Sequence, residues 1–186
     1  MSLPNLKIEA LAASGFDAFA AYLTEHLKDN GTPATGYFQP LSREASVFTG
    51  ERAERFRQAL AVPLGQSGWR RAWVARDDAD TIVGHVDLRA HAEAFTAHRC
   101  LMGLGVAAPH RRQGLARRLV GTACQWARDE AGIDYVDLQV LSRNAAAVLV
   151  YLSLGFRQVG EMADMFRFDG QRFDYTTMTL ALRVSA

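Results

Sequence analysis

Residues 100–118 constrain the fold most, because they join a strand, a turn and a helix in a fixed order. Residues 101–107 are apolar and indicate a strand, which stops at Ala108-Pro109. A basic loop with one glycine follows, and a helix is expected to begin near Leu115. The first amides of such a helix lack an intrahelical partner, and the helix dipole adds partial positive charge there. The order therefore predicts an anion site, most naturally for a phosphate or pyrophosphate.

The composition of this loop supports an anion site. Gly114 lets an oxygen-rich ligand approach the backbone without meeting a Cβ, and four arginines add full charges: Arg111, Arg112, Arg117 and Arg118. A P-loop would need a Lys-Ser or Lys-Thr, which the chain lacks, and a Rossmann turn would need Gly-x-Gly-x-x-Gly directly after the strand. The loop instead fits Arg/Gln-x-x-Gly-x-Gly/Ala over residues 111–116.

A second motif stands at residues 144–156, which read Asn-Ala-Ala-Ala-Val-Leu-Val-Tyr-Leu-Ser-Leu-Gly-Phe. Together with the loop it resembles the GNAT superfamily of N-acetyltransferases, whose members carry Asn-x-x-Ala-x-x-Leu-Tyr-x-x-x-Gly-Phe here. Val150 replaces the leucine that usually precedes the tyrosine. The resemblance covers residues 100–160, with weaker agreement back to Trp69, while residues 1–68 carry no identifying motif.

Hydrophobic periodicity predicts one mixed α/β domain over residues 1–186, with no linker or repeat. Ser14 is expected to cap the first helix, Gly132 to close the third, and Asp169-Gly170 to turn a final hairpin. Strands are expected at 6–10, 71–76, 81–90, 101–107, 135–141, 156–168 and 173–183, and helices at 16–27, 43–60 (interrupted near 49–50), 115–131 and 144–154.

The resemblance implies a single GNAT-like domain with an α/β (α+β mixed) fold. Its central mixed sheet would have about seven strands flanked by about four helices. A splayed parallel strand pair would lie near the cofactor. Residues 1–68 would form the variable acceptor-side region and residues 100–160 the cofactor-binding core.

The resemblance also implies acetyl-coenzyme A as co-substrate, without a metal. The backbone of Leu104, Gly105 and Val106 would bind the pantetheine arm and polarise the thioester carbonyl. Asn144 would cap a helix and contact the cofactor arm, and Tyr151 would protonate the departing thiolate. The pyrophosphate would lie on the loop residues Arg111, Arg112, Gln113, Gly114, Leu115, Ala116 and Arg117.

The proton acceptor is harder to identify. Acetyl transfer needs a neutral amine, so a base or water chain must take a proton. Many GNAT members carry a glutamate on or near the central strand, but residues 100–106 contain no acid. We predict His98 as the catalytic relay, because it directly precedes the central strand, where an acceptor would lie, and imidazole as a group is suited to proton transfer near neutral pH. The other candidates are His85, Asp87 and Glu93, and each of the four is also typical of a surface residue.

The face formed by His85, Asp87 and Arg89 on strand 81–90 is expected to be covered by solvent. A mixed face of this kind would also suit a zwitterionic amino acid. Tyr37 and Phe38 are expected to be core or loop anchors, with a wall of the acceptor pocket as the alternative role.

We therefore expect an N-acetyltransferase that transfers acetyl to a primary amine of a small molecule, amino acid or peptide N-terminus by direct attack. The alternative is a non-catalytic acyl-coenzyme A-binding sensor module: the missing strand glutamate leaves it open, whereas Tyr151 favours the enzyme. Nucleic-acid binding ranks last, because two arginine pairs in a chain of net charge +1 form a small footprint.

The rest of the composition bears on the compartment. Cys100 and Cys124 are the only cysteines, and both are expected to pack as small apolar groups in a reducing cytoplasm. The N-terminus does not resemble a signal peptide, and no apolar run reaches the about 20 residues that span a bilayer, so we expect a cytoplasmic protein without membrane contact. Because GNAT members often pair terminal strands, a homodimer is compatible with the resemblance.

Overall fold

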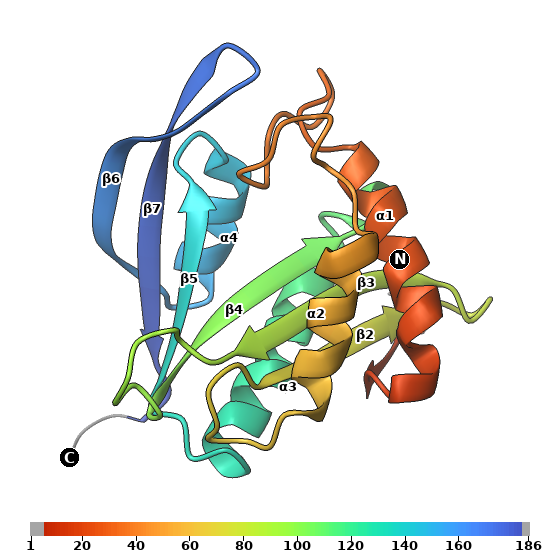
Figure 1. Cartoon of the computed structure of the whole chain (residues 1–186), viewed down its shortest axis with the longest axis vertical. Helices are drawn as coiled ribbons and strands as arrows, with labels where there is room; N and C mark the ends of the chain where they lie inside the picture. Colours follow the sequence, from red (N-terminus) through yellow and green to blue (C-terminus); the bar gives the residue numbers. More distant parts are fainter. Residues whose placement is uncertain (1–5, 184–186) are drawn as a thin grey trace.

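One mixed β-sheet of seven strands, in the order β1-β2-β3-β4-β5-β7-β6, runs through the molecule (Figure 1). The computed structural model describes residues 6–183. All neighbouring strands are antiparallel except β4 and β5, which are parallel. The strands are β1 (Lys7–Ala10), β2 (Arg70–Arg76), β3 (Ile82–Arg89), β4 (Arg99–Val106), β5 (Tyr135–Leu141), β6 (Arg157–Phe168) and β7 (Gln171–Ala181).

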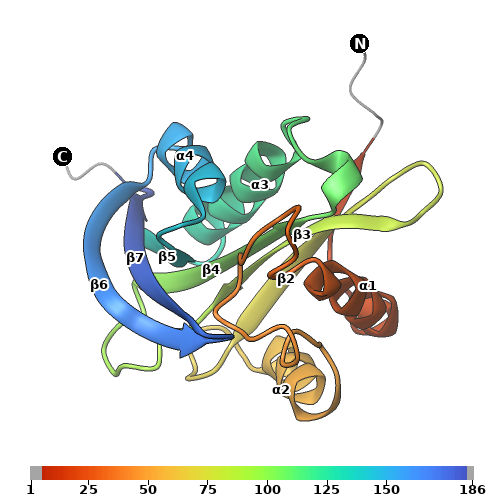
Figure 2. The ribbon, with the colours of Figure 1, turned by 90° about the horizontal axis from the view of Figure 1, so that it is seen from above.

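Four α-helices cover the two faces of this sheet. They are α1 (Phe16–Lys28), α2 (Gly50–Ala61), α3 (Leu115–Asp129) and α4 (Ala145–Ser153), and two short 3-10 helices are η1 (Ala13–Gly15) and η2 (Ala108–His110). Seen from above, α1 and α2 lie on one face, and α3 and α4 on the other (Figure 2). The expected architecture is therefore confirmed.

Each face has its own apolar core, because strand side chains alternate between the two faces. Toward α3, the buried side chains of Leu115, Leu119 and Ala123 join a cluster with residues of β2 to β5. Toward α1 and α2, a second cluster is rich in aromatic rings: Phe16, Phe19, Phe48 and Phe56. Phe19 and Phe56 have ring centroids 5.2 Å apart. Residues 16–61 thus cover one face of the sheet.

The parallel pair β4–β5 is joined at one end only. Its register contains three residue pairs, Arg99 with Tyr135, Cys100 with Val136 and Leu101 with Asp137. From Met102 onward, β4 pairs only with β3 among residues 6–183. Figure 1 shows β4 and β5 diverging toward the upper end of the molecule. This is the expected splayed pair. It leaves the edge of β4 that faces β5 without a strand partner beyond Leu101 in the described part of the chain.

Two local expectations are wrong. Residues 43–49 form turns and extended chain, so the second helix begins at Gly50. The buried side chain of Asn30 holds this segment, since its Nδ2 donates to the carbonyl of Leu41 and to Ser46 Oγ. Ser14 lies within η1, and the N-cap position of α1 is Gly15, without a side-chain cap.

α3 ends earlier than expected: its C-cap is Glu130, and Gly132, with φ 65°, lies two residues further on. Asp169 and Gly170 turn the β6–β7 hairpin as expected, with φ 49° and 70°. No helix within residues 6–183 combines the length and the apolar character needed to cross a membrane.

Candidate active site

The loop between β4 and α3 presents backbone amides at its open side. Gly114 is the N-cap of α3 and has φ 78°, a left-handed conformation that glycine adopts without strain. The first intrahelical bond runs from the Arg118 amide to the Gly114 carbonyl, 3.2 Å. The amides of the preceding residues, Leu115 to Arg117, therefore have no acceptor inside the helix. A Cβ placed on Gly114 would meet no atom within 4 Å, so this side of the loop is open.

Several loop side chains bind the protein itself. Arg111 Nε donates to the Val106 carbonyl at 2.9 Å, and Arg118 Nη2 donates to the Leu6 carbonyl at 2.6 Å. Gln113 Nε2 donates to the Pro109 carbonyl at 2.9 Å, and Arg117 Nη2 to the Ser153 carbonyl at 3.2 Å. These side chains brace the loop against β1, β4 and α4.

Leu115 and Ala116 can serve an anion only through their backbone. The side chain of Leu115 is 1% exposed, and it packs with Leu119 against Gly84 of β3. Burial of Leu115 therefore anchors the first turn of α3 to the sheet, which holds its amides at the end of β4.

The second motif forms α4, beside this loop. Asn144 Oδ1 accepts from the Ala147 amide at 3.2 Å, so its expected capping role is confirmed. The ring of Tyr151 lies 5.8 Å from that of Phe156, centroid to centroid. Burial, followed by the proximity of Tyr175, raises the pKa of Tyr151 to about 12. The phenol therefore keeps its proton at neutral pH.

His98 lies away from these residues. It is exposed, immediately before β4, and its carbonyl accepts from the amides of Asp134 and Tyr135. The loop follows the opposite end of β4, about 25 Å away at about 3.3 Å per strand residue. Glu93 is exposed in the same 91–98 segment. The structure does not bring His98 together with Tyr151 and the loop.

The polar face of β3 is buried, so the expectation of a solvated face is wrong. His85 is 7% exposed and Asp87 5%, because α1 and α2 cover them. Two glycines of β4 make room: a Cβ on Gly105 would collide with the His85 ring, and one on Gly103 with the Asp87 carboxylate. The two glycines lie on the same face of β4, so both side chains lie over the segment of this strand that does not pair with β5.

Charged partners surround Asp87. The Nε atom of Arg70 lies 3.1 Å from Asp87 Oδ2, and Nη1 of Arg89 lies 3.4 Å from the same oxygen. The Arg70 guanidinium also stacks on the Phe56 ring, 4.1 Å from its centroid. Two arginines and one aspartate leave this part of the face with a local charge of about +1.

Two residues of α1, which the sequence did not single out, complete the cluster. The Tyr22 hydroxyl lies 3.3 Å from the Gly105 carbonyl oxygen and 3.2 Å from His85 Nδ1. His26, one turn further, stacks on Tyr22 with ring centroids 5.8 Å apart. The i to i+4 spacing of Tyr22 and His26 on one helix was one available signal.

Burial controls the protonation of these groups. Desolvation lowers the pKa of His85 to about 4; the charge of Asp87 opposes this shift and that of Arg70 adds to it. Desolvation, then His85 and Arg111, lowers the pKa of His26 to about 3. Burial raises the pKa of Tyr22. All three are neutral at neutral pH, so the cluster holds neutral donors and acceptors.

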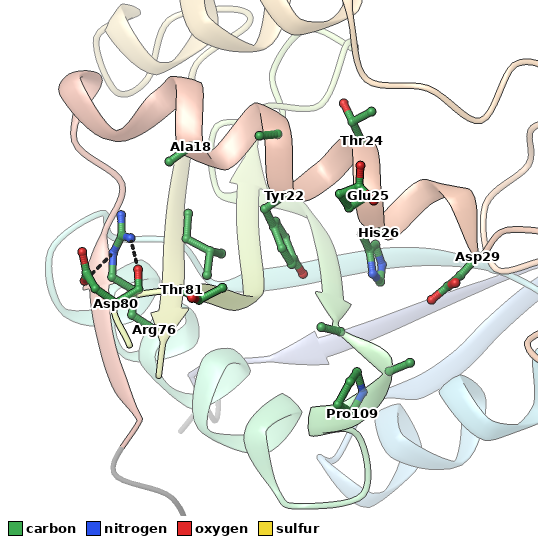
Figure 3. A pocket seen from close by; sticks show the side chains of 14 residues that line it. Ala18, Tyr22, Thr24, Glu25, His26, Asp29, Arg76, Asp80, Thr81 and Pro109 are labelled. Carbon is green, nitrogen blue, oxygen red and sulfur yellow. Dashed lines mark hydrogen bonds and ion pairs between the residues drawn. The ribbon is translucent and has the colours of Figure 1, made fainter. Parts of the chain in front are cut away.

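A cleft of about 930 Å³ opens along α1 next to this cluster (Figure 3). Tyr22 and His26 line it from the helix, Ile82 from β3, and Ala107 and Pro109 from the end of β4 and the loop. Figure 3 shows Tyr22 and His26 pointing from α1 toward the strands. The cleft connects the cluster with solvent.

Tyr37 and Phe38 belong to the segment between α1 and α2. The Tyr37 hydroxyl donates to Asp169 Oδ2 at 2.7 Å, and its ring packs against Phe173 at 5.1 Å. The Phe38 ring lies 5.0 Å from that of His26. The segment therefore ties the β6–β7 turn to the histidine side of the sheet.

The cysteines are packing residues, as expected. Cys100 is fully buried, and burial raises its pKa to about 12. Burial likewise raises the pKa of Cys124 to about 11. Neither thiol is ionised at neutral pH, which argues against a cysteine nucleophile.

Comparison with known proteins agrees with this geometry. The model of the acetyltransferase (GNAT) family matches residues 38–156, more than half of the chain. The chain belongs to the GNAT acetyltransferase family. This GNAT chain is 34% identical over 105 residues to N-acetyltransferase 8B of Rattus norvegicus, covering 54% of this chain and 46% of the relative. It is 41% identical over 61 residues to N-acetyltransferase 8 of Homo sapiens, covering 33% and 26%. The matches thus span less than half of these curated relatives.

Solved structures show the same fold. An acetyltransferase of the GNAT family from Streptococcus pneumoniae superposes with a TM-score of 0.79 at 21% identity, covering 95% of this chain and 99% of that one. The yncA protein of Salmonella typhimurium, solved with its cofactor acetyl-CoA, gives 0.74 at 21% identity, covering 98% and 96%. Spermidine N-acetyltransferase of Vibrio cholerae, in complex with CoA and spermine, gives 0.72 at 17% identity, covering 95% of each chain.

Proposed function

We propose that this protein transfers the acetyl group of acetyl-coenzyme A directly to a primary amine of a small molecule, amino acid or peptide N-terminus. The observation that carries the proposal is the divergence of β4 from β5, which leads into the free amides at the start of α3. An extended pantetheine arm can pair with the free edge of β4, and a pyrophosphate suits the amides.

The backbone supplies most of the binding in this proposal. Leu104 to Val106 of β4 hydrogen-bond the arm and polarise the thioester carbonyl, and the amides from Arg112 to Arg117 hold the pyrophosphate. Arg112 and Arg117 add charge near the phosphates. Arg111 holds the loop to Val106, so its role is to position the amides.

Tyr151 supplies the proton for the departing thiolate. A thiol in water has a pKa of about 8.5, which would make a buried phenol a poor donor. Burial weakens thiol acids as well, and Cys100 of this protein has its pKa raised to about 12. A thiolate desolvated beside Tyr151 would likewise become more basic, which makes the phenol a better proton donor to it.

Calorimetric titration with acetyl-coenzyme A tests the binding step, and thiol release with a panel of primary amines tests the transfer. The proposal expects saturable binding and amine-dependent thiol release. Binding without release for any amine would favour a non-catalytic acyl-coenzyme A sensor instead, in line with the absence of a glutamate on β4. No binding would refute both.

A homodimer through the terminal strand is part of the same proposal. Strand β6 lies at the edge of the sheet and exposes Val159 and Met162, at 60% and 58%. Sedimentation of the protein and of Met162→Glu tests it, and a wild-type monomer at micromolar concentration would refute it.

A further inference from the structure

The hydroxyl of Tyr22 fixes the tautomer of a buried histidine. This hydroxyl contacts two groups, the Gly105 carbonyl at 3.3 Å and His85 Nδ1 at 3.2 Å. A carbonyl oxygen only accepts, and a hydroxyl carries one hydrogen. If Tyr22 donates that hydrogen to Gly105, the hydrogen in the second contact must come from His85 Nδ1. The neutral ring therefore keeps Nε2 unprotonated, with a free lone pair.

Nε2 of His85 is available for a further partner. No hydrogen bond to this atom is formed by any residue within 6–183, although the ring is 7% exposed. The ring lies over Gly105, the residue that pairs with His85 in the β3–β4 register. Gly105 belongs to the segment of β4 that has left β5, where the thioester would lie under the proposed function.

We propose that His85 Nε2 accepts the proton of the acceptor amine and that Tyr22 positions the ring for it. The inference rests on the proposed acetyl transfer and adds the group that the sequence left unidentified. The amine nitrogen forms a bond to the thioester carbon, and the carbon–sulfur bond breaks with its electron pair on sulfur. The nitrogen loses one proton to His85 Nε2, and the sulfur gains one from Tyr151.

Burial of His85 favours a neutral ring at the start of this step, against the opposing charge of Asp87. Asp87 lies on the same strand, Arg70 on β2, and Tyr22 and His26 on α1; Arg111 faces the α1 pair from the loop. Desolvation dominates and lowers the pKa of His85 to about 4. The ring is therefore unprotonated before the step and can accept a proton. The cleft along α1, lined by Tyr22 and His26, gives the proton a route to solvent.

Side chains of β3 and α1 exclude an acidic residue from two positions of β4. A glutamate on β4 at position 103 or 105 would collide with Asp87 or with the two histidine rings. The proposed base, His85, instead lies on the neighbouring strand β3. Gly105 of β4 has no side chain, so the His85 ring can lie over the place of the reacting atoms.

The test compares His85→Ala and Tyr22→Phe with the wild type. General acid–base catalysis contributes about 10²- to 10⁴-fold, so His85→Ala should lower kcat by about 100-fold or more. Its Kd for acetyl-coenzyme A should stay within about twofold, because the cofactor contacts are backbone groups of β4 and the loop. Added imidazole should restore turnover in proportion to its concentration by entering the space that the ring leaves. Tyr22→Phe removes only the positioning bond, and we expect a kcat loss of about tenfold with KM for the amine unchanged.

Three outcomes would overturn the inference. The first is a kcat of His85→Ala within about threefold of the wild type. The second is a loss of kcat in His85→Ala that imidazole does not restore, together with full kcat in Tyr22→Phe, and the third is an equal loss of kcat in His98→Ala. Circular dichroism and thermal unfolding verify that each variant is folded. If the wild type turns over and His85→Ala has the same kcat, only this inference is refuted and the proposed acetyl transfer stands. Wild-type protein that binds acetyl-coenzyme A but releases no thiol with any amine refutes the transferase and the proton acceptor together.

Discussion

Replacing Gly114 by asparagine and by aspartate separates shape from charge at the pyrophosphate loop. Gly114 has φ 78°, and a Cβ there meets no atom within 4 Å. Asparagine and aspartate are the residues that tolerate this left-handed conformation best, and they have nearly the same size. The two variants therefore differ in one negative charge placed beside the free amides of α3.

That charge should weaken binding of acetyl-coenzyme A by a calculable amount. Two unit charges about 4 Å apart repel by about 1 kcal/mol in water and about 4 kcal/mol at an effective dielectric constant of 20. Gly114 is exposed, so a value near 2 kcal/mol is expected for Gly114→Asp. Since about 1.4 kcal/mol is a tenfold change, its Kd should be about 30-fold higher than that of Gly114→Asn.

Calorimetry at two salt concentrations measures this difference. Screening should narrow the gap at about 1 M salt, where the Debye length falls to about 3 Å. Loss of folding cannot imitate the effect, because an acidic residue at a helix N-terminus stabilises it by about 0.3–1 kcal/mol. Equal affinity of the two variants at low salt would refute the assignment of the pyrophosphate to this loop.

Three further predictions follow from the site. Tyr151→Phe should lower kcat about 100-fold and leave the Kd for acetyl-coenzyme A unchanged, measured by thiol release and calorimetry; unchanged kcat would remove Tyr151 as the donor. Burial lowers the pKa values of His85 and His26 to about 4 and about 3, so the unfolded chain, whose histidines titrate near 6.5, binds more protons below that pH. Each ring should therefore lower the free energy of unfolding by about 2 kcal/mol between pH 6.5 and 5. Urea unfolding at pH 7 and 5 should show that His26→Leu loses about half of this pH dependence of stability. A variant whose stability depends on pH as strongly as that of the wild type would contradict the burial argument. Because Arg89 lies beside Gly103 in a cluster of positive local charge, Arg89→Gln should raise KM for an amino-acid acceptor about tenfold and spare a simple alkylamine; equal effects on both acceptors would refute a carboxylate contact.

Local patterns predicted the fold well, because most elements carry their own signals. The Asp169-Gly170 turn, the alternation along β2 and β3, and the amphipathic stripe of α3 each appear where the sequence placed them. Residues 43–49 were misassigned as helix because the decisive contact is nonlocal: Asn30 holds Ser46, 16 positions away in the chain. No periodicity within the segment records that bond.

The conformations of the loop and of α4 were predictable for the same reason, because each is one continuous stretch of sequence. The cluster of side chains over β4 was not. The cluster of Tyr22, His26 and His85 is assembled from α1 and β3. Tyr22 and His85 are 63 positions apart in the sequence. One sequence signal was present: Gly103 and Gly105 alternate along a strand, which indicates that something approaches its backbone closely.

The Arg99–Asp137 ion pair lies at the end of the parallel pair where β4 and β5 are joined. Arg99 donates two hydrogen bonds to Asp137, of 2.8 and 2.6 Å. The part of β4 that does not pair with β5, from Met102 to Val106, is about 17 Å long at about 3.3 Å per residue, so a change of about 5° in the angle between the two strands would move its far end by about 1.5 Å. A misplacement of about 1 Å can reduce catalysis about 100-fold. A small change of strand angle at the joined end would therefore be large enough to matter at the diverging end.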